Sequence, residues 1–240
     1  MRLLVSVANA AEASAALAGG ADLIDAKDPA TGALGAVSPQ VFLDIHARVS
    51  GERPVTAALG DALEEEDIER TARTFAAAGA RLVKVGFAGI ASAERAGALT
   101  AAAVRGASSG GTRRCGVVAV AYADADRAGS IAPDALVEVA ARAGAEGMLI
   151  DTAFKDGPGL RDLMVSGTLA MLVRRMHERG LFVALAGRLT AGDLPFIRET
   201  GADVAGVRGA ACDTGRTGHV SADRVRLLQQ SGASIRKESR

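Results

Sequence analysis

Two lysines and two aspartates of this chain belong to short apolar runs, where a charged side chain has little access to water. Asp25 and Lys27 end LIDAK, Lys84 lies inside LVKVG, and Asp151 ends GMLID. Burying such a charge without a partner costs several kcal/mol, so we expect these groups to pair or to take part in chemistry. Burial lowers the pKa of a lysine, and its neutral amine can form a Schiff base with a carbonyl compound.

The positions of these residues along their expected strands predict where their side chains point. Asp25 and Lys27 are two residues apart, so a strand places both on one face. The valines beside Lys84 suit the opposite, helix-facing side, which leaves Lys84 facing inward. Two inward lysines lower each other's pKa, so one could be a nucleophile and the other a proton donor or acceptor. Structural interpretations stay open: Asp25 and Lys27 could form an ion pair at a barrel rim, and Lys84 could reach toward solvent.

Loops after the later strands carry further candidates. Lys155 follows Asp151 by four residues and could clamp the polar end of a substrate, although it could equally be solvated. Asp124 and Asp126 follow another expected strand, in AYADAD. Catalytic groups of (β/α)₈ barrels lie in such loops, and we interpret Asp126 as a surface residue.

Two glycine-rich segments predict a phosphate site. Gly187 lies in AGR, and Gly209 follows Arg208 in RGAAC. Glycines let backbone N–H groups approach phosphate oxygens, and the loops after the seventh and eighth barrel strands often hold phosphate. We therefore expect Gly187, Arg208 and Gly209 to contact a phosphate group. Arg208 could instead be the ion-pair partner of an aspartate on a neighbouring strand.

Short apolar runs alternate with helical patterns along the whole chain. We expect strands at 3–7, 23–27, 55–60, 82–87, 116–122, 147–152, 182–187 and 204–209, and helices at 9–18, 39–49, 64–78, 91–105, 133–143, 168–179, 190–200 and 221–231. Eight β-then-α units predict a parallel sheet closed into a (β/α)₈ TIM barrel. We expect this single catalytic domain over 1–231, a flexible loop at 106–114, and a flexible C-terminal tail at 232–240.

A Gly-Ala pair precedes four of the expected strands, at Gly20, Gly79, Gly144 and Gly201. Two interpretations stay open. The repeats could record duplication of a βαβα module, or they could meet the same geometric demand at each turn from a helix into a strand.

Composition narrows the class of protein. The chain has 28 basic and 28 acidic residues, and this balance argues against a nucleic-acid partner. No apolar stretch reaches the roughly 18 residues of a membrane span. Two cysteines and three histidines without ligand spacing argue against a disulfide framework and a structural metal site. We expect a cytoplasmic protein, and the sequence leaves a homo-oligomer open.

Five segments, in this order and spacing, resemble a known family: DLIDAKDPATGALGA (22–36), LVKVGF (82–87), AYADADRAG (121–129), LIDTAFKDG (149–157) and GVRGAACDTGR (206–216). They look like the (5-formylfuran-3-yl)methyl phosphate synthases of methanofuran biosynthesis, a family similar to class I aldolases in fold and chemistry. The resemblance implies a carbon–oxygen lyase acting on phosphates. Such an enzyme condenses two molecules of glyceraldehyde 3-phosphate into a furan-aldehyde phosphate, without a metal or redox cofactor, and releases phosphate and two waters.

The resemblance also implies roles for single residues. Lys27 matches the Schiff-base lysine and Lys84 the proton-transfer lysine, while Asp25, Asp151 and Lys155 match other positions of the pocket. Asp28 stands where an asparagine is common in the family. Other functions stay open: another class I aldolase or a phosphosugar isomerase using the same pocket, or a phosphosugar-binding module without turnover.

Overall fold

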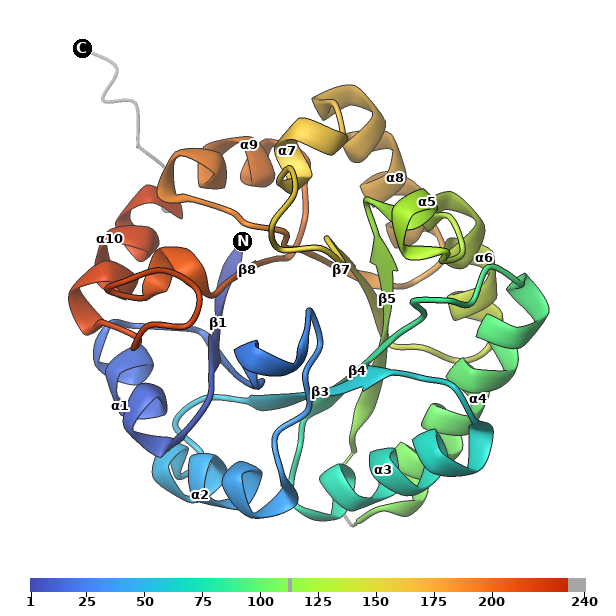
Figure 1. Ribbon diagram of the computed structural model, residues 1–240, viewed down its shortest axis with the longest axis horizontal. Helices are drawn as coiled ribbons and strands as arrows, with labels where there is room; N and C mark the ends of the chain where they lie inside the picture. Colours follow the sequence, from blue (N-terminus) through green and yellow to red (C-terminus); the bar gives the residue numbers. More distant parts are fainter. Residues whose placement is uncertain (112–113, 233–240) are drawn as a thin grey trace.

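A computed structural model describes residues 1–111 and 114–232, which contain eight parallel strands arranged as a closed barrel (Figure 1). Each strand pairs with the next along the chain, and the last pairs with the first. The strands are β1 (Arg2–Val7), β2 (Leu23–Ala26), β3 (Val55–Asp61), β4 (Leu82–Gly86), β5 (Gly116–Tyr122), β6 (Gly147–Asp151), β7 (Phe182–Leu185) and β8 (Val204–Val207). The predicted TIM barrel is therefore confirmed.

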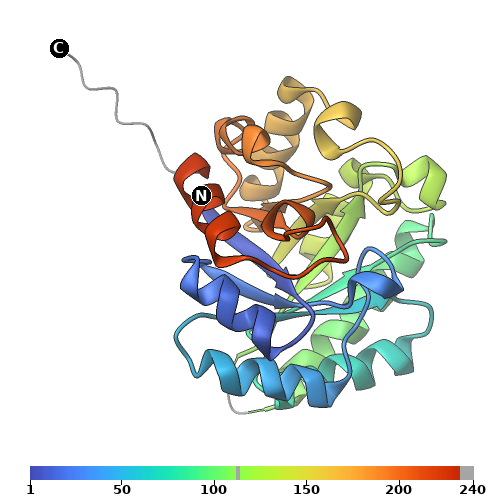
Figure 2. The same ribbon diagram turned by 60° about the vertical axis from the view of Figure 1, so that its left-hand side comes forward.

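Helices form a ring outside the barrel, as the two ribbon views show (Figures 1 and 2). They are α1 (Ala10–Ala18), α2 (Pro39–Val49), α3 (Glu65–Ala77), α4 (Ala93–Ser109), α5 (Ala125–Ala128), α6 (Pro133–Arg142), α7 (Leu160–Leu163), α8 (Ser166–Glu178), α9 (Leu194–Glu199) and α10 (Ala222–Gly232). Three short 3₁₀ helices are η1 (Pro29–Thr31), η2 (Ala191–Asp193) and η3 (Gly209–Ala211). Over 1–111 and 114–232, no helix combines the length and the apolar character needed to cross a membrane.

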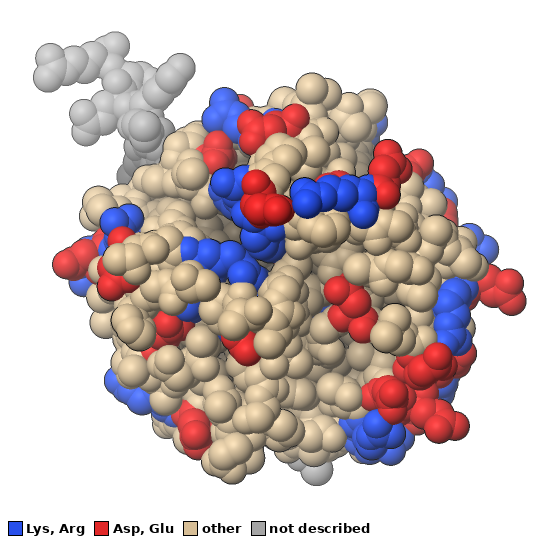
Figure 3. Space-filling model, viewed as in Figure 1, with Lys and Arg blue, Asp and Glu red and all other residues tan. Residues whose placement is uncertain are grey.

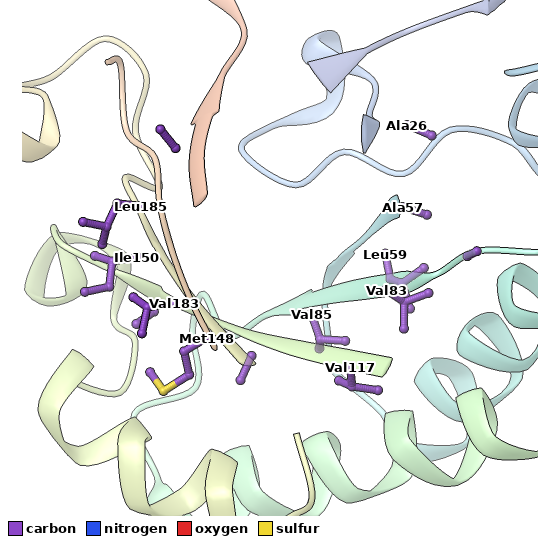
Figure 4. Close-up of a cluster of buried hydrophobic side chains, with 14 of the residues drawn as sticks. Ala26, Ala57, Leu59, Val83, Val85, Val117, Met148, Ile150, Val183 and Leu185 are labelled. Carbon is purple, nitrogen blue, oxygen red and sulfur yellow. The ribbon is translucent and has the colours of Figure 1, made fainter. Parts of the chain in front are cut away.

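Alternate residues of the strands face the helices and are apolar. Figure 4 shows part of this layer, with Val83 and Val85 of β4 near Val117 of β5, and Ile150 of β6 near Leu185 of β7. The intervening residues face the barrel interior. The valines of β4 thus occupy the outer side, and Lys84 between them faces inward, as the sequence predicts.

The predicted loop at 106–114 is wrong over its first part, because α4 continues to Ser109. Gly106 is buried where α4 crosses α3, and a Cβ there would lie 2.1 Å from the carbonyl oxygen of Glu69. The glycine therefore permits close helix packing rather than ending the helix. Residues 112–113 of this expected loop lie outside the described part of the chain.

Several expected boundaries differ by one or two residues. β2 ends at Ala26 and β8 at Val207, so Lys27 and Arg208 are the first residues of the loops that follow. Gly232, expected in the tail, is the last residue of α10, and the rest of the expected tail at 232–240 lies outside the described residues. The site residues consequently sit where the strands open into their loops.

The loop between β2 and α2 crosses the mouth of the barrel (Figure 1). Its two ends are joined, because the Asp28 N–H donates to the Gly35 carbonyl over 2.9 Å. Leu34 is only 2% exposed and packs within the inner apolar cluster, together with Tyr122 of β5. A buried leucine therefore holds this loop down over the strand ends.

The four Gly-Ala pairs share one backbone geometry. Gly20, Gly79, Gly144 and Gly201 all have positive φ, between 83° and 98°. Each lies between a helix end and the next strand, where a left-handed residue closes the helix. This geometric demand is sufficient to explain why glycine recurs at these turns.

We expect Gly144→Ala to lower the free energy of unfolding by about 1–2 kcal/mol, because L-residues disfavour the left-handed conformation. The added Cβ would lie 3.7 Å from Val104, so the loss would reflect backbone strain rather than a clash. Gly97→Ala within α4 is the matched control, which should raise the stability by about 0.5–1 kcal/mol. Urea unfolding of the three proteins measures both changes. A Gly144→Ala protein as stable as the parent would contradict this account.

Candidate active site

A cavity of about 440 Å³ opens at the mouth of the barrel and extends into its interior. Figure 3 looks onto this face and shows lysine and arginine side chains beside a central hollow. The chain has four lysines, and Lys27, Lys84 and Lys155 all line this cavity. Arginine supplies most of the other positive charge. Lysine, which can lose its proton when buried, is thus concentrated at this one place.

Asp25 and Lys84 form a buried ion pair deep in the barrel. Asp25 is fully buried and Lys84 is 5% exposed, and the Lys84 Nζ lies 2.5 Å from Asp25 Oδ2. Hydroxyls from both neighbouring strands donate to the same carboxylate, Ser6 Oγ over 2.9 Å and Thr56 Oγ1 over 2.7 Å. The carboxylate therefore has partners on β1, β3 and β4.

The interpretation of Asp25 and Lys27 as an ion pair, which the sequence left open, is therefore not what the structure shows. Residues two apart on a strand are separated by about 6.6 Å along it, so Lys27 lies closer to the mouth than Asp25. Lys84 belongs to β4, and it reaches Asp25 across the interior past the hydroxyl of Thr56 on β3. Lys27 and Lys84 share the cavity as predicted, but Lys84 is the lysine that forms the ion pair with Asp25.

Lys27 is buried without a carboxylate partner of its own. It is 7% exposed, and within the described residues no carboxylate lies within 4.0 Å of its Nζ. Burial lowers the pKa of Lys27 to about 8; Asp151 and Asp25 oppose this shift, while Lys84 and Lys155 reinforce it. At pH 7 about a tenth of the Lys27 side chains are then neutral amines, the form that imine formation requires, and this fraction rises with pH.

Asp151 and Lys155 form a second ion pair, at the level of the mouth. The Lys155 Nζ donates to Asp151 Oδ1 and to the Thr152 carbonyl, each over 2.6 Å. Burial disfavours ionisation of Asp151, but Lys155 and Lys27 outweigh it, so the pKa of this carboxyl lies below its usual value. Lys155 is therefore engaged by Asp151 rather than solvated, and the ionised carboxylate can stabilise a cation formed at Lys27.

Asp124 holds the loop that carries Lys155. Its two carboxylate oxygens accept the N–H groups of Ala153, over 2.7 Å, and Phe154, over 3.0 Å. The Arg127 guanidinium also lies 3.8 Å from the centre of the Phe154 ring. The strand-end aspartate in AYADAD was the only sequence signal for this role. Asp126, in contrast, is exposed, as expected.

Gly187 and Gly209 both line the cavity, on the loops after β7 and β8. Gly187 has φ of 111°, and a Cβ there would lie 3.1 Å from Thr152 Cγ2. Gly209 begins η3, and a Cβ there would lie 3.5 Å from the Arg216 backbone nitrogen. Close backbone approach is thus possible at both loops, and phosphate binding there stays a prediction.

Arg208 is fully occupied within the protein. Its guanidinium forms a buried, two-pronged ion pair with Glu12 of α1 and donates to the carbonyls of Ser6, Arg216 and Gly218. These contacts use all five N–H donors of the side chain. This geometry does not support direct phosphate binding by Arg208, and the alternative of a structural ion pair fits better, with a glutamate of α1 as the partner. Sequence reasoning missed Glu12.

The arrangement offers one reactive amine and two ion pairs that can move protons around it. Lys27 lies near both ion pairs, since all four of their charges act on its pKa. Such a constellation suits chemistry on a carbonyl compound, in which imine formation, proton abstraction and loss of water each need a proton donor or acceptor.

The chain is similar to known proteins over nearly its whole length. Residues 3–229 match the family model described as 4-HFC-P synthase. The (5-formylfuran-3-yl)methyl phosphate synthase of Methanopyrus kandleri is 41% identical over 235 residues, covering 96% of this chain and 98% of that protein. The enzyme of that name from Methanosarcina barkeri is 37% identical over 229 residues, covering 95% and 97%.

Solved structures share the fold. 3-Hexulose-6-phosphate synthase has a TM-score of 0.64 at 22% identity, covering 97% of this chain and 100% of that one. Phosphoribosyl anthranilate isomerase from Thermus thermophilus has a TM-score of 0.64 at 14% identity, covering 98% and 100%. At these identities the likeness concerns the barrel alone.

We expect imine formation at Lys27 to increase with pH around a midpoint near 8, because only the neutral amine reacts. Asp151→Asn should move the midpoint to lower pH, since Asp151 raises the pKa of Lys27. Lys155→Met should move it to higher pH, since Lys155 lowers that pKa. Trapping with borohydride and glycolaldehyde, followed by peptide mass mapping, gives the rate at each pH. Unchanged midpoints in both variants would contradict the assigned electrostatics.

Proposed function

Because the chain belongs to the 4-HFC-P synthase family, we propose that it condenses two molecules of glyceraldehyde 3-phosphate into (5-formylfuran-3-yl)methyl phosphate. The reaction releases phosphate and two waters, and the enzyme is a carbon–oxygen lyase acting on phosphates. The observation that carries the proposal is Lys27, a buried amine with a lowered pKa and no carboxylate partner of its own, at the mouth of a cavity.

In the proposed reaction, Lys27 Nζ attacks the carbonyl carbon of one triose phosphate, and the carbonyl oxygen leaves as water. The resulting iminium ion acidifies the adjacent C–H bond, so loss of that proton gives an enamine. The enamine expels the phosphate from C3 of this triose, which leaves an enol that ends in a CH2 carbon. This carbon then forms the new C–C bond with C2 of the second triose phosphate, which has isomerised to its ketone tautomer. Asp151 lies on the mouth side, where its ionised carboxylate supports the iminium charge.

Lys84 is proposed to donate and accept protons during the eliminations. Its ammonium is held by Asp25 and is close enough to Lys27 to lower the pKa of that amine. When a hydroxyl leaves as water, the C–O bond breaks and the oxygen takes a proton, which an ammonium can supply. When phosphate leaves, it keeps the electron pair of the broken C–O bond. A hydroxyl of the second triose closes the ring on C2 of the first, two hydroxyls leave as water, and formation of the aromatic furan drives the sequence forward. Water finally hydrolyses the imine, which releases the aldehyde and returns Lys27 as an amine.

We expect Lys27→Arg to reduce kcat by at least about three orders of magnitude, because a guanidinium cannot form the imine. Lys84→Arg, which keeps a cation beside Asp25, should retain the borohydride-trapped adduct at Lys27 but lose about 100- to 10,000-fold in kcat. Incubation with glyceraldehyde 3-phosphate alone, followed by near-ultraviolet absorbance and mass spectrometry, measures the furan product.

This incubation also separates the alternatives. An aldol product or a ketose phosphate without near-ultraviolet absorbance would favour another class I aldolase or a phosphosugar isomerase. Tight binding of the triose phosphate without any product would favour a binding module. An adduct located on a residue other than Lys27, or turnover without any adduct, would overturn the proposed mechanism.

We propose that backbone N–H groups near Gly187 and Gly209 hold one substrate phosphate. Gly209→Val should then raise the KM about tenfold, because the side chain obstructs a charge-assisted hydrogen bond. Imine formation at Lys27 should persist at saturating substrate. Gly167→Val is the matched control, since Gly167 is exposed on α8 with no atom within 4 Å of its added Cβ. A normal KM in the Gly209→Val enzyme would remove this loop from the phosphate site.

A further inference from the structure

Two arginines at the mouth of the barrel, Arg188 and Arg216, line the same cavity as Lys27 and were not among the residues predicted to bind substrate. They differ from Arg208, whose five N–H donors all have protein partners. The two have donors left over, and both face the space in which the substrates of the proposed reaction would meet.

Arg188 is held in a conformation that arginine disfavours. Its φ is 58°, in the left-handed region that residues other than glycine disfavour. The side chain is exposed, and within the described residues it has neither a hydrogen-bond nor an ion-pair partner. Leu189 beside it is buried and fixes the chain. A strained backbone that presents an unpaired cation to a cavity is the pattern of a ligand-binding position.

Arg216 spans the mouth from the β8 loop to the β2 loop. Its two terminal nitrogens each donate one hydrogen bond, to the carbonyls of Pro29 and Gly32. Nε and one hydrogen on each terminal nitrogen have no acceptor in the described part of the chain. Arg208 fixes the backbone of this residue by donating to the Arg216 carbonyl over 2.9 Å. The guanidinium is thus held in place with about three donors available to a ligand.

The charges of the cavity leave these two arginines in excess. Three cations are matched by buried or half-buried carboxylates: Lys84 by Asp25, Lys155 by Asp151 and Arg208 by Glu12. Lys27 has a lowered pKa and becomes part of the imine. Arg188 and Arg216 therefore add a charge of about +2, which matches the −1.5 to −2 of a phosphate monoester near neutral pH.

We propose that Arg188 and Arg216 form a second anion site, which binds the phosphate of the second triose phosphate. This inference rests on the proposed function, because two triose phosphates bring two phosphate groups and the Gly187 and Gly209 backbone accommodates one. The second site lies at the open mouth. Arg216 contacts the β2 loop, which begins at Lys27, so the site lies on that side of the cavity. A guanidinium can hold two oxygens of a phosphate that keeps the electron pair of a broken C–O bond, so the site also suits the phosphate that is released.

The test isolates the second site by filling the first. Borohydride reduction with a limiting amount of glyceraldehyde 3-phosphate fixes one triose phosphate on Lys27. Inorganic phosphate is then titrated into this trapped enzyme by calorimetry. The parent should bind one phosphate per chain, and Arg188→Gln and Arg216→Gln should each weaken this binding at least about tenfold. Arg174→Gln on α8, whose side chain is 73% exposed, is the matched control and should bind like the parent.

Three results would overturn the proposal: no phosphate binding to the trapped parent, undiminished binding by the double variant, or loss of the Lys27 adduct itself in either single variant. The last would show that the arginines serve the first triose phosphate. If the parent forms no adduct, the proposed function fails at Lys27, and the titration is made on the free enzyme. Two phosphates per parent chain and one in the double variant would then support the second site, whereas equal numbers would refute it.

Discussion

The buried ion pair between Asp25 and Lys84 determines the properties of the other lysine in the cavity. Asp25 is two residues before Lys27 on the same expected face of the strand, and it is engaged by Lys84, Ser6 and Thr56. Lys27 is consequently left without a partner of its own, and burial can lower its pKa. Removing one member of a buried ion pair costs about 3–5 kcal/mol of stability, so Asp25 stays paired with Lys84 and does not become the partner of Lys27. The proposed chemistry depends on it, because a lysine tightly paired with a carboxylate is a poor nucleophile.

The arginines of the rim divide into two roles. Arg208 joins the β8 loop to β1 and α1 through Glu12 and three backbone carbonyls. With every donor in use, it acts as part of the framework. The framework in turn places Arg216, which has donors to offer. An arginine in the loop predicted to bind phosphate therefore need not itself contact the phosphate.

The β2 loop links the mouth of the barrel to the proposed nucleophile. It begins at Lys27, closes on itself between Asp28 and Gly35, and inserts Leu34 into the inner apolar cluster. Arg216 joins the other side of this loop to β8. The loop thus covers part of the cavity and shields Lys27 from water, which helps to keep the amine neutral.

Local patterns in the sequence were sufficient to predict the strands, the barrel and the inward direction of Lys84. Strand alternation, apolar runs and glycines at helix ends are local signals, because each arises from residues that are close together in the sequence. Asp151 and Lys155 were both predicted to belong to the pocket, but their ion pair was not predicted, although only four residues separate them. Several boundaries differed by one or two residues, and Gly106 was mistaken for a loop residue because the helix that packs against it is distant in sequence.

Only the tertiary structure decided which charges meet. Lys84 reaches Asp25 from another strand, and Arg208 meets Glu12 across 196 positions of the chain. These partners depend on the register between strands and on the closure of β8 against β1, neither of which local spacing contains. The sequence by itself therefore determined that the three lysines belong to the cavity, whereas the folded chain was needed to place Arg188 and Arg216 there. The closed barrel decided which of them are neutralised by a partner and which remain free to react or bind, because pairing in a buried site is set by distance across the fold.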